Sequence, residues 1–126
     1  MPKRVITGDG VVASTFPFSQ IVEANGFVHL AGQVGDDPAT HAIAPGGIEG
    51  ETRQMLLNVG RLLRVAGLDY GDVVQSTVYL TDFDEFARMN AVYREFFPTD
   101  PPTRATVGVT RLAGTFRVEI VCIATR

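Results

Sequence analysis

The chain contains no tryptophan, a single cysteine and only two histidines among its 126 residues. Cys122 alone cannot form an internal disulfide, and His29 and His41 are far apart in the sequence, with no ligand spacing around them. We therefore expect neither a disulfide nor a metal site. Cys122 lies in an alternating apolar run, where a small buried hydrophobic residue is a better interpretation than a nucleophile.

Long runs of one residue type are also missing. The 11 Lys and Arg residues form no run and are outnumbered by 14 Asp and Glu residues, for a net charge of −3. Proteins that bind nucleic acid or an anionic membrane typically carry a basic patch. No apolar run of signal-peptide length follows Met1, and none reaches the length of a membrane span. We expect a cytoplasmic protein with no nucleic-acid or membrane partner, folded as one domain over residues 1–126.

The first half of the chain predicts a β-hairpin. Residues 21–24 and 27–31 are rich in β-forming side chains and flank Asn25-Gly26, a strong signal for a tight hairpin turn. The second run ends at Gly32, where the backbone can be approached closely and its N–H could be offered to an anion. A merely flexible strand exit is the alternative.

Apolar spacing predicts a long helix over residues 48–66, followed by a strand over 72–81. Gly67 is expected to end the helix, and Gly60 within it indicates a close packing contact. The residues that recur at intervals of three and four are Thr52, Met55, Leu56, Val59, Leu62, Leu63 and Ala66.

A second helix is expected after Asp82, with Glu85 placed to complete a capping box. Pro98 would end it. Its predicted stripe consists of Phe83, Phe86, Ala87, Asn90 and Phe97. Asn90 is the polar member, and it is either a satisfied amide at the edge of the stripe or a site residue.

Residues 101–126 predict a second hairpin, with two alternating runs around a turn at Ala113-Gly114. The predicted core face consists of Ala105, Val107, Val109, Val118, Ile120, Cys122 and Ala124. The opposite face would carry Arg104 and Glu119 on the order of 10 Å apart, with Gly108 leaving space beside the carboxylate. The pair is either a small-ligand site or a solvated cross-strand ion pair.

The order of these elements predicts an α+β fold, with about six strands in a mixed sheet and two helices packed on one face. Residues 4–7 would form a short edge strand. The other face stays open, and Val121 and Ile123 on it are expected to be buried against another copy of the chain. The residues support self-association without giving its number.

Several motifs that together cover nearly the whole chain resemble the RidA/YjgF family of enamine/imine deaminases. They are Phe16-Pro17-Phe18-Ser19-Gln20, Ala31-Gly32-Gln33, Asn58-Val59, Asn90-Ala91-x-Tyr93-x-x-Phe96-Phe97, Pro102-Thr103-Arg104-x-x-Val107, Leu112, Val118-Glu119-Ile120 and Ile123-Ala124. The resemblance implies a chorismate-mutase-like fold and a homotrimer with ligand clefts between its subunits. It also implies hydrolysis of 2-imino or 2-enamino acids, which are reactive products of dehydratases, to 2-keto acids and ammonia.

The resemblance further implies roles for single residues. Arg104 would hold the substrate carboxylate through two parallel hydrogen bonds, and Glu119 would activate water. The N–H of Gly32 would contact the polar end of the substrate, and Asn90 from a neighbouring subunit would help to close the cleft. No metal or organic cofactor is required, because an imine is already electrophilic.

Three residues depart from the usual family pattern. Phe18 stands where the family usually has Tyr, Ala31 where it often has Ser, and Thr106 where it often has Cys. Each change removes or moves a hydrogen-bonding group, which leaves the choice of imine open. The alternatives are an aminomuconate-type deaminase and a non-catalytic trimer that binds small carboxylates or acts like a chaperone. A ribonuclease is least favoured because of the acidic balance.

Overall fold

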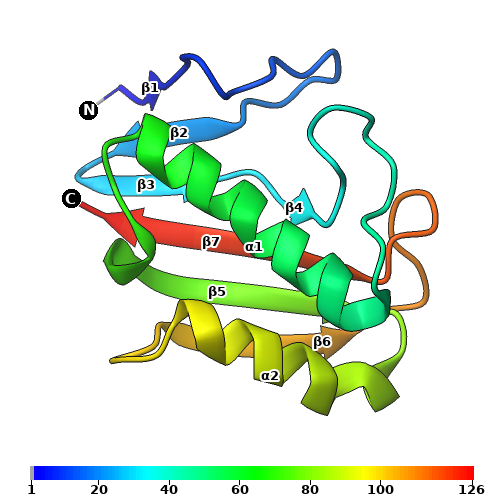
Figure 1. The fold of residues 1–126 in the computed structure, drawn as a ribbon. Coiled ribbons are helices and arrows are strands. Elements are labelled where there is room, and N and C mark those ends of the chain that lie inside the picture. Colours follow the sequence, from blue (N-terminus) through cyan, green and yellow to red (C-terminus); the bar gives the residue numbers. More distant parts are fainter. Residues whose placement is uncertain (1) are drawn as a thin grey trace.

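The computed structural model describes residues 2–126. The chain folds around a single mixed sheet of seven strands (Figure 1). The strand order is β1-β2-β3-β7-β5-β6, and the short β4 also pairs with β7. The strands are β1 (Arg4–Val5), β2 (Ile21–Ala24), β3 (Phe27–Leu30), β4 (Gln33–Val34), β5 (Val73–Leu80), β6 (Thr103–Gly108) and β7 (Val118–Thr125). The predicted edge strand is therefore confirmed as β1.

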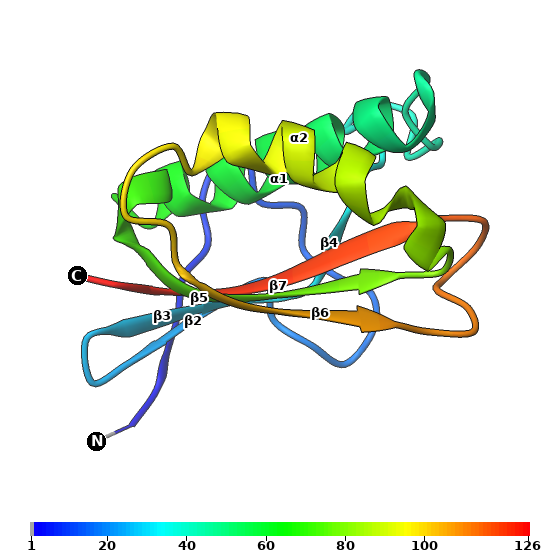
Figure 2. The same ribbon diagram turned by 90° about the horizontal axis from the view of Figure 1, so that it is seen from below.

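Two helices, α1 (Gly47–Val65) and α2 (Phe86–Phe96), lie side by side on one face of the sheet (Figure 2). Short 3-10 helices, η1 (Tyr70–Asp72) and η2 (Phe83–Glu85), precede β5 and α2. The α+β class and the two helices on a mixed sheet are confirmed. None of these helices is both long and apolar enough to cross a membrane.

Helix α1 follows the prediction closely. Every residue of its predicted stripe is buried, so the apolar face packs on the sheet. Gly67 follows the helix with a left-handed φ of 79°, a conformation that glycine adopts without strain. A side chain at Gly60 would overlap the Tyr70 hydroxyl, which explains the glycine in the middle of the helix.

The first hairpin is also confirmed. β2 and β3 pair antiparallel, with Ala24 opposite Phe27. Asn25 and Gly26 have φ values of 54° and 81°, as a tight hairpin turn with two left-handed residues requires.

The predicted C-terminal hairpin is wrong. β5 lies between β6 and β7, pairing parallel with β6 and antiparallel with β7. The segment after β6 therefore passes the end of β5 before the chain returns as β7. Two alternating runs joined by a short turn-rich segment look the same in sequence whether or not a third strand is inserted between them.

The insertion also reverses the predicted face of β6. Ser76 of β5 is paired with Cys122 on one side and with Arg104 on the other, so all three point to the helix-covered face. Tyr79 is paired with Glu119 and with Val107, and these point to the open face. The assignment for β7 is confirmed, because Val118, Ile120, Cys122 and Ala124 are buried. For β6 it is wrong: Val107 is exposed and Arg104 lies under α2.

The predicted stripe of α2 is only partly correct. Phe97 is buried in the core and Phe86 packs against it, but Ala87 is exposed and Phe83 is about half exposed. The residues that the helix itself buries are Met89, Val92 and Tyr93. Asp82 does accept a hydrogen bond from the N–H of Asp84, but the Glu85 carboxylate does not complete a capping box. It is bound instead by the guanidinium of Arg117, and this ion pair ties the start of α2 to the start of β7.

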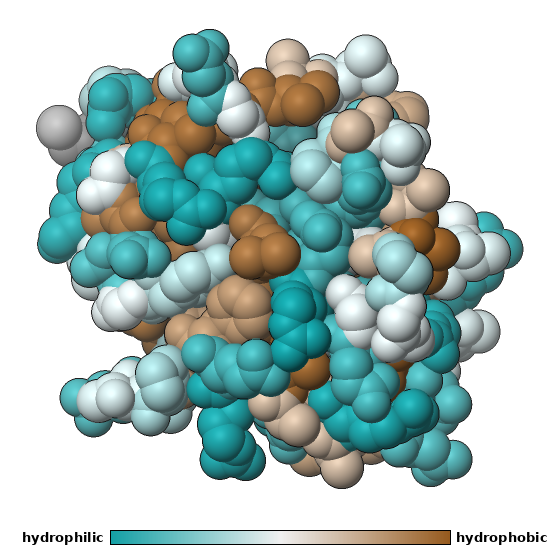
Figure 3. All heavy atoms as spheres, viewed as in Figure 1, coloured by the Kyte–Doolittle hydropathy of each residue, from teal (hydrophilic) through white to brown (hydrophobic). Residues whose placement is uncertain are grey.

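The two faces of the molecule differ in character. On the side that carries the helices, apolar side chains are scattered among hydrophilic ones (Figure 3). The open face carries Val5, Phe27 and Val107, which are 40–48% exposed, next to the half-buried Val121 and Ile123. Cys122 is buried on the opposite side, and burial raises the pKa of its thiol to about 12.

Candidate functional site

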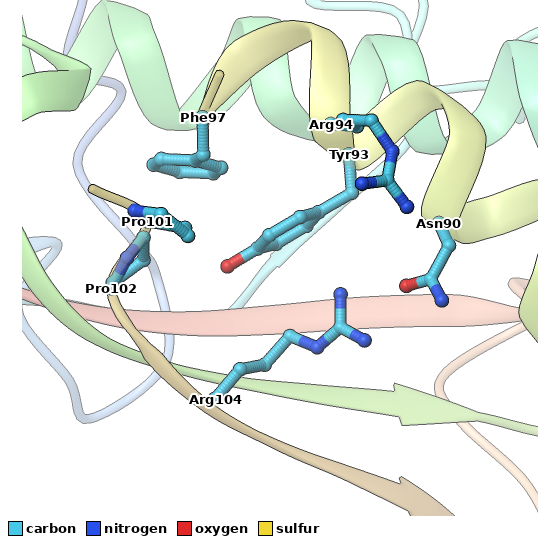
Figure 4. A pocket seen from close by; sticks show the side chains of 7 residues that line it. All are labelled: Asn90, Tyr93, Arg94, Phe97, Pro101, Pro102 and Arg104. Carbon is cyan, nitrogen blue, oxygen red and sulfur yellow. The ribbon is translucent and has the colours of Figure 1, made fainter. Parts of the chain in front are cut away.

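Arg104 is held between β6 and α2 by aromatic rings. Its guanidinium carbon lies 4.6 Å from the ring centre of Tyr93 and 5.6 Å from that of Phe86. A guanidinium over a ring face is attracted by the ring quadrupole and keeps its N–H groups free at its edge. Figure 4 shows the group turned toward Tyr93 and the Asn90 amide.

Tyr93 is itself fixed in place. Its hydroxyl and the Ser76 hydroxyl lie 2.7 Å apart inside the protein, and its ring packs on Phe97 at 4.7 Å. Burial raises the pKa of the phenol, so the ring next to Arg104 stays neutral at physiological pH. The result is a rigid support that positions the guanidinium without neutralising it.

A pocket of about 240 Å³ opens beside this guanidinium. It is lined by Asn90, Tyr93, Arg94, Phe97, Pro101, Pro102 and Arg104 (Figure 4). Pockets for drug-sized ligands measure about 300–1,000 Å³, so this one suits a small metabolite. Among residues 2–126, no carboxylate lies within 4.0 Å of the Arg104 guanidinium, so its fork is free to bind one.

Glu119 belongs to a second, wider pocket of about 620 Å³ on the other side of the sheet. Its lining residues are Phe18, Ser19, Val22, His29, Leu30, Ala31, Gly32, Ala113 and Glu119. A Cβ on Gly32 would overlap the Glu119 carboxylate, so a side chain at this position would push the carboxylate away from its present place. Partial burial raises the pKa of Glu119 above its ordinary value.

The proposed site residues therefore fall into two groups within one protomer. Asn90 lines the same pocket as Arg104, so these two residues come together within one chain. Phe18, Ala31 and Gly32 lie with Glu119. Thr106 is half-buried on the face of β6 that carries Arg104, and it lines neither pocket.

Arg104 and Glu119 do not face each other. They are two strands and three residue positions apart in the sheet, roughly 14 Å at ordinary strand spacings, and they point to opposite faces. The predicted separation of about 10 Å on one shared face is wrong. A single copy of the chain cannot bring both groups to one small ligand.

Several residues that line these pockets were not predicted as site residues from the sequence. Tyr93 and Arg94 lie three and four residues after Asn90, a spacing that places them on the same side of a helix. That spacing could have identified both. His29 lines the Glu119 pocket from β3, and only the pairing of β3 with β7 brings it there.

Across residues 2–126, no three His, Cys, Asp or Glu side chains gather closely enough to hold a metal ion.

The helix-backed, open-faced sheet defines an α+β protein of the chorismate-mutase-like architecture. The family model described as "Endoribonuclease L-PSP" matches residues 10–126. The RutC family protein PH0854 of Pyrococcus horikoshii is 41% identical over 122 residues, which cover 97% of each chain. The 2-iminobutanoate/2-iminopropanoate deaminase of Capra hircus is 38% identical over 97% of this chain and 89% of its own.

Solved structures agree with these sequence relatives. The Rid family protein YyfA of Yersinia pestis superposes with a TM-score of 0.92 at 32% identity, covering 99% of this chain and all of its own. E. coli TdcF, solved with bound serine, superposes with a TM-score of 0.89 at 34% identity over 98% of both chains. The chain belongs to the RidA/YjgF family.

The raised pKa of Glu119 makes a prediction about stability. A carboxyl whose pKa is higher in the folded than in the unfolded state stabilises the fold below its ordinary value of 4.5, and this contribution is lost as the pH rises through the folded-state pKa. Glu119→Gln should therefore melt at a higher temperature than the wild type at about pH 7. The gain should vanish as the pH falls below 4.5.

Thermal unfolding followed by circular dichroism across this pH range measures the effect. Glu95→Gln is the matched control, because it removes the same charge from a carboxylate that is 57% exposed and paired with Arg53. The control should show no gain at neutral pH. A Glu119→Gln protein that is no more stable than the wild type there would contradict the prediction.

Proposed function

We propose that this protein hydrolyses reactive 2-imino and 2-enamino acids to 2-keto acids and ammonia. Relatives that are 34–38% identical over 97% of this chain carry the name 2-iminobutanoate/2-iminopropanoate deaminase. The observation that carries the proposal is the chemistry of the two pockets, one with an unpaired guanidinium and the other with a half-buried carboxylate. Together they supply a group that can bind the substrate carboxylate and a base that can take a proton from water.

Arg104 would bind the substrate carboxylate. Its planar fork can donate two parallel hydrogen bonds to two carboxylate oxygens, and it stays charged at all physiological pH values. The Tyr93 ring at 4.6 Å limits the directions in which the guanidinium can turn. An anchored carboxylate places the adjacent imine carbon at one position, which lowers the entropic part of the barrier.

Glu119 would act as the base. The substrate reacts as the protonated imine: the Glu119 carboxylate takes a proton from water while the water oxygen bonds to the imine carbon, and the C=N electron pair becomes the lone pair of an amine. The carboxyl then gives that proton to the nitrogen, the C–N bond breaks with its electron pair going to nitrogen, and the hydroxyl proton passes to the departing ammonia, which leaves as ammonium and gives the keto acid. A raised pKa suits this role, because a carboxylate of higher pKa accepts a proton from water more readily.

The complete site would then be formed between copies of the chain, in a homotrimer. The separation of Arg104 from Glu119 supports this, since a single protomer holds them on opposite faces of the sheet. The apolar side chains Val5, Phe27 and Val107 on the open face support it as well. We propose that the open face of one copy brings its Glu119 pocket to the Arg104 pocket at the β6 edge of the next.

Three other functions can be distinguished from this deaminase by experiment. An aminomuconate-type deaminase would use the same two pockets with a different acid. A non-catalytic trimer that binds small carboxylates would keep the role of Arg104 without turnover, and the apolar Phe18 and Ala31 in the Glu119 pocket favour it most. A ribonuclease would be expected to show a strongly salt-dependent affinity for RNA, which the net charge of −3 disfavours.

A coupled assay tests the deaminase. A threonine dehydratase generates the imino acid in place, and release of the keto acid is followed with the wild type, Arg104→Ala and Arg4→Ala. Arg4 lies at the opposite edge of the sheet, so its variant removes the same charge outside both pockets. Acceleration by the wild type and Arg4→Ala, with a loss of roughly a hundredfold or more in Arg104→Ala, is expected. No acceleration by the wild type would overturn the proposal.

A further inference from the structure

A second arginine lines the pocket of Arg104. Arg94 lies on α2 one helical turn after Asn90, and it contributes to the same pocket wall (Figure 4). Arg94 and Arg104 reach this pocket from opposite sides, one from the helix and one from β6. None of the seven lining residues is acidic.

The neighbouring carboxylate does not neutralise Arg94. Glu95 directs both of its oxygens to Arg53 on α1, at 2.9 and 2.8 Å. Among residues 2–126, no Asp or Glu oxygen lies within 4.0 Å of the Arg94 guanidinium. Two unpaired positive charges therefore border one pocket of about 240 Å³.

This arrangement discriminates between ligands by charge. Two like charges at one small site repel each other, and a bound anion relieves the repulsion. A ligand with one carboxylate can pair fully with only one of the guanidinium groups. A ligand with two anionic groups can pair with both, and the Asn90 amide can add a hydrogen bond between them.

We propose that the Arg94–Arg104 pocket selects acids that carry a second anionic group, such as dicarboxylic acids of about four or five carbons. Arg104 binds the carboxylate next to the reacting carbon, and Arg94 binds the distal one. This inference rests on the proposed function, and it names 2-imino derivatives of dicarboxylic amino acids as the substrate class. Their hydrolysis takes up one water and releases one ammonia, as for any imine.

Calorimetric titration with two keto acids of equal chain length tests the inference. 2-Oxoglutarate and 2-oxopentanoate differ only in the terminal carboxylate. The wild type should bind 2-oxoglutarate roughly fivefold more tightly or better, and Arg94→Gln should lose this preference, with a smaller loss of affinity for 2-oxopentanoate than for 2-oxoglutarate. Arg104→Gln should weaken the binding of both acids. Arg4→Gln, which removes the same charge at the far edge of the sheet, should behave as the wild type.

The outcomes separate the two proposals. Equal binding of the two acids, or a preference that survives in Arg94→Gln, would overturn the role of Arg94 and leave the deaminase proposal standing. A preference that is lost equally in Arg4→Gln would reflect net charge and would also overturn it. If the wild type binds neither acid, both the carboxylate site and the selectivity built on it are wrong.

Discussion

In the proposed homotrimer, subunits carrying Arg104→Ala and subunits carrying Glu119→Gln are each expected to be inactive alone. Mixed trimers of the two are then expected to recover roughly one third of wild-type activity. The expectation follows from the pairing of β5, which places the two side chains on opposite faces of the sheet. If each cleft takes Arg104 from one subunit and Glu119 from the next, every mixed trimer retains one cleft with both residues.

Co-expression with two different affinity tags, followed by purification on both, isolates the mixed trimers for the coupled assay. A mixture of Arg104→Ala with Arg104→Gln subunits is the matched control, because both variants damage the same half of the cleft. It should recover nothing. Failure of the Arg104→Ala and Glu119→Gln mixture to exceed this control would show that the two residues do not complete a cleft across subunits.

The parts of the fold that the sequence predicted well are those set by local rules. Asn25-Gly26 identifies a two-residue turn, and the stripe from Thr52 to Ala66 identifies α1, because neighbours along the chain decide both. The faces of β7 were predicted correctly for a related reason. Its apolar residues are buried under the helices, and strict alternation marks that face without knowledge of the strand's neighbours.

The face of β6 could not be predicted in the same way. Ala105 and Val107 are the more apolar alternate residues, yet they point to the open face, while Arg104 and Thr106 point toward α2. The polar residues are tolerated there because Arg104 lies against aromatic rings at the edge of the helix layer. Hydrophobic alternation assumes that the helix-covered face is the apolar one, and Arg104 on that face breaks this assumption.

Because the face of β6 was predicted wrongly, the grouping of the site residues was predicted wrongly as well. The family resemblance named residues of both pockets, but it could not say which of them one protomer brings together. That depends on β5 entering between β6 and β7, a contact between segments far apart in the sequence. The roles of Arg104 and Glu119 stay predictions that the activity measurements test.

The start of β7 is organised by a buried carboxylate, Glu51, which has no exposed surface. One of its oxygens accepts hydrogen bonds from the N–H groups of Arg117 and Val118, at 2.6 and 3.1 Å. The other lies 3.4 Å from the guanidinium nitrogen Nε of Arg117, whose Nη1 donates to Glu85 at 2.7 Å. Glu51 thereby links α1, the start of α2 and the strand that carries Glu119.

Glu51→Ala is expected to lower the free energy of unfolding by about 3–5 kcal/mol, because it leaves two backbone N–H groups and part of a charged cluster without partners. Glu51→Gln keeps the size and one acceptor oxygen, so a smaller loss of about 1–3 kcal/mol is expected. Urea denaturation measures both, and Glu95→Ala is the control. That carboxylate is 57% exposed, and its ion pair with Arg53 should contribute no more than about 1 kcal/mol.

The Glu51→Gln substitution should affect the Glu119 pocket as well as the stability of the fold. Val118, whose N–H binds Glu51, is the residue before Glu119, so a Glu51→Gln protein that still folds should release the start of β7 and move the Glu119 carboxylate. We expect its deaminase rate to fall more than its affinity for a keto acid at the Arg104 pocket, since among residues 2–126 Glu51 makes no direct hydrogen bond or ion pair with a residue that lines that pocket. Equal unfolding energies for Glu51→Gln and Glu95→Ala, with unchanged turnover, would contradict this role for Glu51.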